Sequence, residues 1–193
     1  MVSNLFLFLI EAAASFATLM LLARFFMQWQ RVSFHNQLGQ FVLATTDWCV
    51  RPLRRVLPGL FGMDLASLVP GWVIQTLMVL LQLMLFGASL DGNPAALLLG
   101  ACGVGLVGLL KMMVYLVIGI VLISAVFSWV NPHAPMAPLF YSLSAPFLRP
   151  LRKVIPPIAN VDISPMVLLL LLQVVLMLLS NFAAGFSGMM FSR

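Results

Sequence analysis

Four long apolar stretches constrain this 193-residue chain more than any other feature of its sequence. A helix crosses the hydrocarbon core of a bilayer with about 20 consecutive apolar residues. Stretches of that length cover residues 5–29, 68–90, about 108–130 and 165–186. Only 8% of the residues are charged, whereas a soluble domain carries roughly 25%. The sequence therefore predicts an all-α, polytopic membrane protein with four transmembrane helices.

The apolar, glycine-rich segment 95–110 leaves the number of crossings open. It could extend the third span, form a re-entrant segment or cross the membrane as a fifth span. Seven of the ten Lys and Arg residues lie in two long loops, 30–67 and 131–164. A fifth crossing would place these loops on opposite sides, which the preference of basic loops for the cytoplasm disfavours. We therefore expect four spans, with both basic loops in the cytoplasm and both termini on the outer side.

An internal repeat divides the chain into two units, residues 1–94 and 95–193. Residues 51–58 (RPLRRVLP) match residues 149–156 (RPLRKVIP) at six of eight positions, with an offset of 98. Further pairs are related by 98 residues or, before the loops, by 100: Asp64 and Asp162, Gln75 and Gln173, Trp29 and Trp129. Because the two basic loops share a side, we expect parallel helix–basic loop–helix repeats related by an axis along the membrane normal.

Each loop contains a short basic element that we expect to be amphipathic. A helix over residues 52–57 would begin with Pro52 in its first turn and place Leu53, Val56 and Leu57 on one face. Such a helix lies in the plane of the membrane interface. Six cations are candidates for binding anionic lipid or a protein partner: Arg51, Arg54, Arg55, Arg149, Arg152 and Lys153. The alternative is that they set the topology and anchor the loops to phospholipid.

Two aspartates, Asp64 and Asp162, stand at corresponding positions just before an apolar span. Each could favour the positive end of the helix dipole or pair with an arginine of its own loop. The alternative is an ion or substrate site formed by both aspartates near the pseudo-axis. We expect the structural pairing.

Ionisable and amide side chains inside the spans are further candidates, because each charge costs several kcal/mol in the bilayer, about 2.5–3.5 on insertion scales. Arg24 is expected to snorkel toward the cytoplasmic interface. Glu11 has a candidate partner in Lys111, which we expect at the outer end of the third span. The amides of Gln75 and Gln173 are expected to hold helices together, with a polar path as the alternative.

The sequence contains no nucleophile–base pair, phosphate-binding glycine loop or cluster with metal-ligand spacing. We therefore expect neither enzymatic activity nor a cofactor. The net charge of +5 would suit nucleic acid, but the cations adjoin apolar spans, where anionic lipid and membrane topology explain them. The expected partner is the lipid bilayer, and no nucleic acid.

The second repeat resembles the YggT family of integral membrane proteins, in its two-repeat proteobacterial form. The resemblance rests on residues 128–132 (SWVNP), 148–156 (LRPLRKVIP) and 162–165 (DISP), and the first repeat carries similar residues. It implies a small protein of the bacterial inner membrane, in which the termini expected on the outer side would be periplasmic. It further implies links to cell division and to osmotic or potassium stress, with plastid relatives connected to nucleoid distribution, plastid division and cytochrome maturation. The resemblance supplies no established catalytic residues.

Two functional hypotheses follow. The first is a non-enzymatic organising protein whose paired basic loops bind anionic lipid or a membrane or cytosolic protein. The second is a small transporter or channel component for ion or osmotic homeostasis. In that case a polar path would be lined by Glu11, Gln75, Lys111, Gln173 and the two aspartates, Asp64 and Asp162. Four spans are too few to enclose a transport pathway within one chain, so the second hypothesis requires a homo-oligomer.

Overall fold

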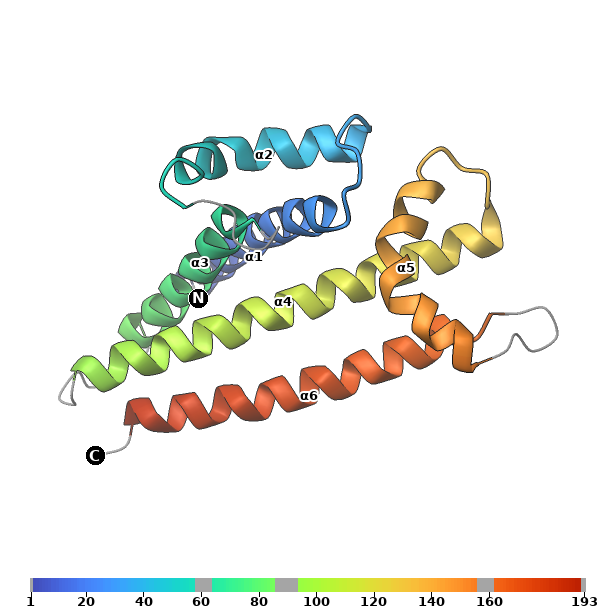
Figure 1. Ribbon diagram of the computed structural model, residues 1–193. Coiled ribbons are helices and arrows are strands. Elements are labelled where there is room, and N and C mark those ends of the chain that lie inside the picture. The colour runs from blue at the N-terminus through green and yellow to red at the C-terminus, as the bar shows by residue number, and fades with distance from the viewer. Residues whose placement is uncertain (1, 58–63, 86–93, 156–161, 192–193) are drawn as a thin grey trace.

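The computed structural model describes residues 2–57, 64–85, 94–155 and 162–191, which form six α-helices and no strand (Figure 1). The helices are α1 (Val2–Trp29), α2 (Gln37–Leu53), α3 (Leu65–Leu85), α4 (Pro94–Val130), α5 (Ala137–Val154) and α6 (Ser164–Phe191). Within these residues α1, α3, α4 and α6 are long and apolar enough to cross a membrane. The predicted all-α fold with four spans is confirmed. Residues 86–90 of the second predicted span lie outside the described residues.

The helices form two similar groups, each with a shorter helix resting on two long ones (Figure 1). α2 contacts α1 and α3, and α5 contacts α4 and α6. The groups meet where α4 packs against α3 and α1. α2 and α5 both lie toward the end of the bundle opposite the marked N- and C-termini (Figure 1). A pseudo-twofold axis along the membrane normal stays a prediction.

The ambiguous segment 95–110 is part of α4, a continuous helix of 37 residues. At 1.5 Å per residue such a helix is about 55 Å long, well beyond the hydrocarbon core of about 30 Å. The segment therefore extends the third span rather than forming a separate crossing. Lys111 lies near the middle of this helix, and its expected position at the outer end of the span stays a prediction.

Close packing between α3 and α4 depends on two glycines. A Cβ added at Gly105 would lie 2.8 Å from the backbone of Thr76, and one at Gly108 would lie 3.0 Å from Oε1 of Gln75. The Trp72 indole nitrogen on α3 also donates to the Cys102 carbonyl on α4, at 3.0 Å. Small residues let helix backbones approach in a membrane, where apolar burial gives little driving force.

The basic amphipathic helices are longer than predicted. α2 begins at Gln37 because the Asn36 side chain caps it, accepting a 2.6 Å hydrogen bond from the Gly39 amide. Pro52 therefore occupies the last turn of α2 and not the first turn of a short helix. Val56, which was expected on the apolar face of the short helix, follows the end of α2 and is 78% exposed. The buried face of α2 is formed instead by Gly39, Val42, Thr46 and Val50.

The turn between α1 and α2 is closed by a residue in the left-handed region. Arg31 has a φ of 54°, and the amide of Val32 donates to the Met27 carbonyl at 2.8 Å. This pattern ends many helices, usually with glycine at the left-handed position. It turns the chain back so that α2 lies over the end of α1.

Candidate functional site

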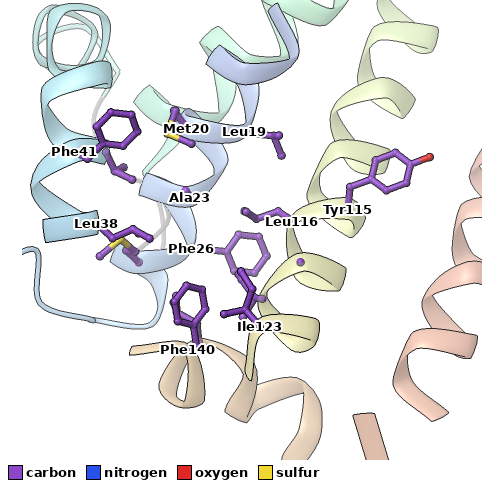
Figure 2. Close-up of a pocket in the computed structure, with 15 residues that line it drawn as sticks. Leu19, Met20, Ala23, Phe26, Leu38, Phe41, Tyr115, Leu116, Ile123 and Phe140 are labelled. Carbon is purple, nitrogen blue, oxygen red and sulfur yellow. The ribbon is translucent and has the colours of Figure 1, made fainter. Parts of the chain in front are cut away.

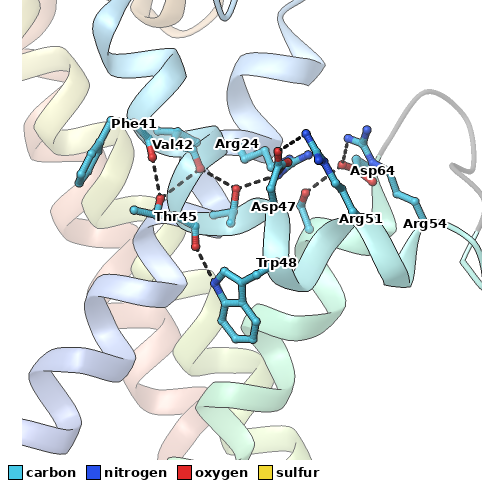
Figure 3. A network of polar contacts seen from close by, with 11 residues as sticks. Arg24, Phe41, Val42, Thr45, Asp47, Trp48, Arg51, Arg54 and Asp64 are labelled. Atoms are coloured by element: carbon cyan, nitrogen blue, oxygen red, sulfur yellow. Dashed lines mark hydrogen bonds and ion pairs between the residues drawn. The ribbon is translucent and has the colours of Figure 1, made fainter.

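Arg24 of α1 is buried beneath α2 with a side chain paired to two residues (Figure 3). Its Nη1 atom donates to Oγ1 of Thr46 and to Oδ1 of Asp47, each at 2.8 Å. The residue is only 2% exposed. The prediction that Arg24 snorkels to the interface is therefore wrong. The Asp47 carboxylate on the covering helix supplies a countercharge and a hydrogen bond that offset the hydration lost by the buried guanidinium.

Asp47, which the sequence reasoning missed, is shared by two arginines. Its second oxygen, Oδ2, forms an ion pair with Nη2 of Arg51, one helical turn along α2, at 2.7 Å. The four-residue spacing of Asp47 and Arg51 is a recognised helical ion-pair pattern. The chain has only five acidic residues, and an arginine inside an apolar span needs one of them. These two signals together would have identified Asp47.

Both predicted aspartates pair with an arginine of their own loop, ten residues earlier. In the first half, Oδ2 of Asp64 accepts from Nη2 of Arg54 at 2.6 Å and from Oγ of Ser67 at 2.9 Å (Figure 3). In the second half, Oδ2 of Asp162 accepts from Nε of Arg152 at 2.7 Å. The pairs connect the ends of α2 and α5 to the start of the following span.

These ion pairs hold both aspartates in the charged form. Burial acts to raise the pKa of the Asp64 carboxyl, but hydrogen bonds from Arg54 and Ser67 and the arginine charge outweigh it and lower the pKa. The pKa of Asp162 is lowered in the same way. There burial is outweighed by hydrogen bonds from Ser164 and Arg152 and by the charge of Arg152.

A polar contact between a span and the shorter helix that covers it occurs in both halves, between α1 and α2 and between α4 and α5. Arg24 and Thr46 correspond to Ser124 and Ser144 at the sequence offsets of 100 and 98. The hydroxyls of Ser124 and Ser144 are buried and lie 3.0 Å apart. The second half has Ala145 at the position of Asp47, so its contact is uncharged.

All six candidate cations of the basic helices are exposed. Three have carboxylate partners, namely Arg51, Arg54 and Arg152. The other three, Arg55, Arg149 and Lys153, make no ion pair with any described residue. Arg55 and Lys153 occupy corresponding positions in the two repeats.

Large apolar side chains are exposed beside these cations. Trp48 on α2 is 77% exposed, and its indole points away from Arg51 and Arg54 (Figure 3). Val56 and Val154, which follow α2 and end α5, are 78% and 79% exposed. Trp29 and Trp129 are also exposed, at the ends of α1 and α4 that adjoin these helices. Tryptophans and cations together are typical of the boundary between lipid and water.

The intramembrane candidates do not converge on one path. Gln75 donates from Nε2 to Oγ1 of Thr18 at 3.2 Å, joining α3 to α1 as expected for an amide that holds helices together. Glu11 and Gln173 instead lie exposed on the outer faces of α1 and α6. Lys111 is half-buried, and the described residues include no ion pair between it and Glu11.

An apolar cleft of about 360 Å³ lies between α1 and α4, next to α2 and α5 (Figure 2). Its walls are almost wholly apolar, with Phe26 and Leu116 from the spans and Phe41 and Phe140 from the covering helices. Among the described residues, no Asp, Glu, His, Lys, Arg or Cys lines the cleft. It is chemically suited to hold hydrocarbon.

Comparison with known proteins assigns the chain to a family. A sequence model described as CCB3/YggT matches residues 3–85 and 104–183. The chain belongs to the CCB3/YggT family. The uncharacterized protein YggT of Escherichia coli is 33% identical over 175 residues, covering 89% of this chain and 87% of that protein. The uncharacterized protein PA0392 of Pseudomonas aeruginosa is 34% identical over 185 residues, covering 95% and 92%.

A third relative, an uncharacterized protein of Haemophilus influenzae, is 30% identical over 171 residues, covering 88% of this chain and 86% of that protein. No solved structure matches the chain. The predicted YggT resemblance is thus confirmed over nearly the whole sequence.

Proposed function

We propose that this chain is a non-enzymatic membrane-organising protein whose basic helices α2 and α5 bind anionic phospholipid. The observation that carries the proposal is that α2 and α5 each have three exposed cations at or just beyond their C-terminal ends, and that both helices pack against two spans. Anionic lipid attracts such a segment by about 1 kcal/mol for each Lys or Arg near the surface.

The pairing of the arginines supports a fixed lipid-binding surface. Arg24 and Asp47 tie α2 to α1, and Arg54 and Asp64 tie its end to α3. The backbone that carries these cations does not need to be ordered when a lipid binds, which lowers the entropic cost of binding. Arg55, Arg149 and Lys153, which have no described ion-pair partner, are the residues that we assign to head-group phosphate.

The exposed apolar residues support insertion of these helices into the interface. Trp48, Val56 and Val154 would enter the boundary between head groups and acyl chains, while the cations stay at the phosphate level. We place this surface on the cytoplasmic side of a bacterial inner membrane, because basic loops are retained there. The organising role would then concern processes at that surface, such as cell division, envelope assembly or the response to osmotic stress.

The proposal is tested by measuring the lipids that stay bound to the purified protein. The chain is reconstituted in nanodiscs with equal amounts of phosphatidylglycerol and phosphatidylcholine, extracted gently and analysed by native mass spectrometry. We expect phosphatidylglycerol to be enriched on the wild-type protein. The triple variant Arg55→Gln, Arg149→Gln, Lys153→Gln should lose most of that enrichment, because it removes cations without breaking an ion pair.

The matched control is Lys111→Gln, which removes a cation from the middle of α4 and should keep the enrichment. Equal retention of both lipids by the wild-type protein would refute the proposal. So would a triple variant that retains phosphatidylglycerol as the wild type does.

A further inference from the structure

The outer face of α6 carries amide side chains without partners. Gln173 and Asn181 are both exposed, and neither forms a hydrogen bond with any described residue. Gln173 is the tenth residue of α6, about 14 Å from its start, so it lies near the middle of the hydrocarbon core. α6 packs against α4 and α5, and its remaining surface faces outward.

The corresponding residue in the first half shows how such an amide is satisfied. Gln75 lies on α3, which packs against both α1 and α4, and it donates to Oγ1 of Thr18. α6 has one long neighbour in place of two, so the equivalent partner is missing beside Gln173. Lipid chains cannot supply a hydrogen bond, and polar groups within spans therefore associate with one another.

We propose that α6 binds a second copy of this chain, with Gln173 of one copy hydrogen-bonded to Gln173 of the other. A carboxamide is both donor and acceptor, so two of them satisfy each other reciprocally. A twofold axis along the membrane normal keeps both copies in the same orientation and brings identical residues together at the same depth. A different membrane protein would need its own polar group at that depth.

The surface around Gln173 permits this approach. Ser180, Ala184 and Gly188 are spaced by four residues on the exposed face, toward the C-terminal end of α6. A Cβ at Gly188 would meet nothing within 4 Å in this chain, so the surface is open there. Small residues at this spacing let two helices pack closely beyond the amide contact.

The inference is tested by measuring self-association of the full chain in liposomes as it is diluted in lipid, by counting photobleaching steps of a fluorescent label. We expect dimers. An interhelical hydrogen bond contributes about 0.6–2 kcal/mol, so Gln173→Leu should raise the dimer dissociation constant about three- to thirty-fold. Gln173→Asn retains the amide and should keep the constant within about threefold of wild type. Gln82→Leu on α3, the same change elsewhere in a span, should have no effect.

A cross-linking arm locates the contact. In a variant without Cys49 and Cys102, Met177→Cys should form a disulfide between copies, because it lies one turn from Gln173 on the exposed face. Leu122→Cys on α4 should not. A chain that stays monomeric, dimers unaffected by Gln173→Leu, or cross-linking to a different protein in native membranes would each overturn the inference.

Discussion

Nη1 of Arg24 lies 2.8 Å from Oδ1 of Asp47 and joins the first span to the basic helix that covers it. Arg24 is buried, whereas Asp47 is partly accessible and also binds Arg51. The ion pair therefore runs from the interior of the bundle to its charged surface. It fixes α2 against the end of α1.

Removing the countercharge of Arg24 should destabilise the fold strongly. Asp47→Asn leaves a buried guanidinium without a carboxylate, and breaking a buried pair in this way costs about 3 kcal/mol. We expect a clear fall in the unfolding temperature of the protein in detergent. Adding Arg24→Met, which removes the stranded charge, should recover part of the loss. A single Asp47→Asn variant as stable as wild type would show that the pair is not needed.

Stability should depend on pH in the acid range through Asp64. Its pKa is lowered in the folded protein, so the ion pair with Arg54 contributes stability above the unfolded pKa of about 3.9. That stability is lost as the pH falls through the folded pKa. The unfolding temperature should be nearly constant from about pH 7 to 5 and should fall below about pH 4. Asp64→Asn should flatten part of the decline, and an unchanged profile would argue against this assignment.

Gly105 should be far less tolerant of alanine than Gly119, although both lie in α4. A Cβ at Gly105 would clash with Thr76 on α3, and we expect Gly105→Ala to cost about 1–3 kcal/mol. A Cβ at Gly119 would meet nothing within 4 Å, so Gly119→Ala should be neutral or stabilising by up to about 1 kcal/mol. Equal unfolding temperatures for the two variants would contradict the packing described between α3 and α4.

Arg31 occupies a backbone conformation that favours glycine. Arg31→Gly should therefore stabilise the protein, by up to about 1 kcal/mol, even though it removes a cation from an exposed turn. Gln40→Gly, on an exposed position of α2, should instead destabilise by about 1 kcal/mol. The free energies of unfolding are compared by chemical unfolding in mixed micelles. A lower free energy of unfolding for Arg31→Gly than for wild type would contradict this prediction.

The spans were predictable because hydrophobic length is a strong signal. Trp29 and Val130, where α1 and α4 end, were predicted as the ends of the first and third spans. The ion pairs of Asp64 and Asp162 could also be anticipated, because the repeat presents each aspartate beside the arginines of its own loop.

The missed features depend on contacts between elements distant in sequence. The start of α2 is set by the cap at Asn36, well before the basic residues that suggested a short helix beginning at Pro52. Burial of Arg24 depends on α2 folding back over α1, which places Asp47 beside it. The outward position of Gln173 depends on which helices neighbour α6, and the repeat alone made it equivalent to Gln75.

The selectivity of the protein for spin-labelled lipid tests the central claim most directly. Electron paramagnetic resonance measures the fraction of label immobilised at the protein surface. For wild type, immobilised phosphatidylglycerol should exceed phosphatidylcholine at low salt, and the difference should shrink at 1 M salt because charges there are screened beyond about 3 Å. The triple variant at Arg55, Arg149 and Lys153 should show little selectivity at any salt concentration. Equal immobilisation of the two lipids by the wild-type protein at low salt would contradict the account.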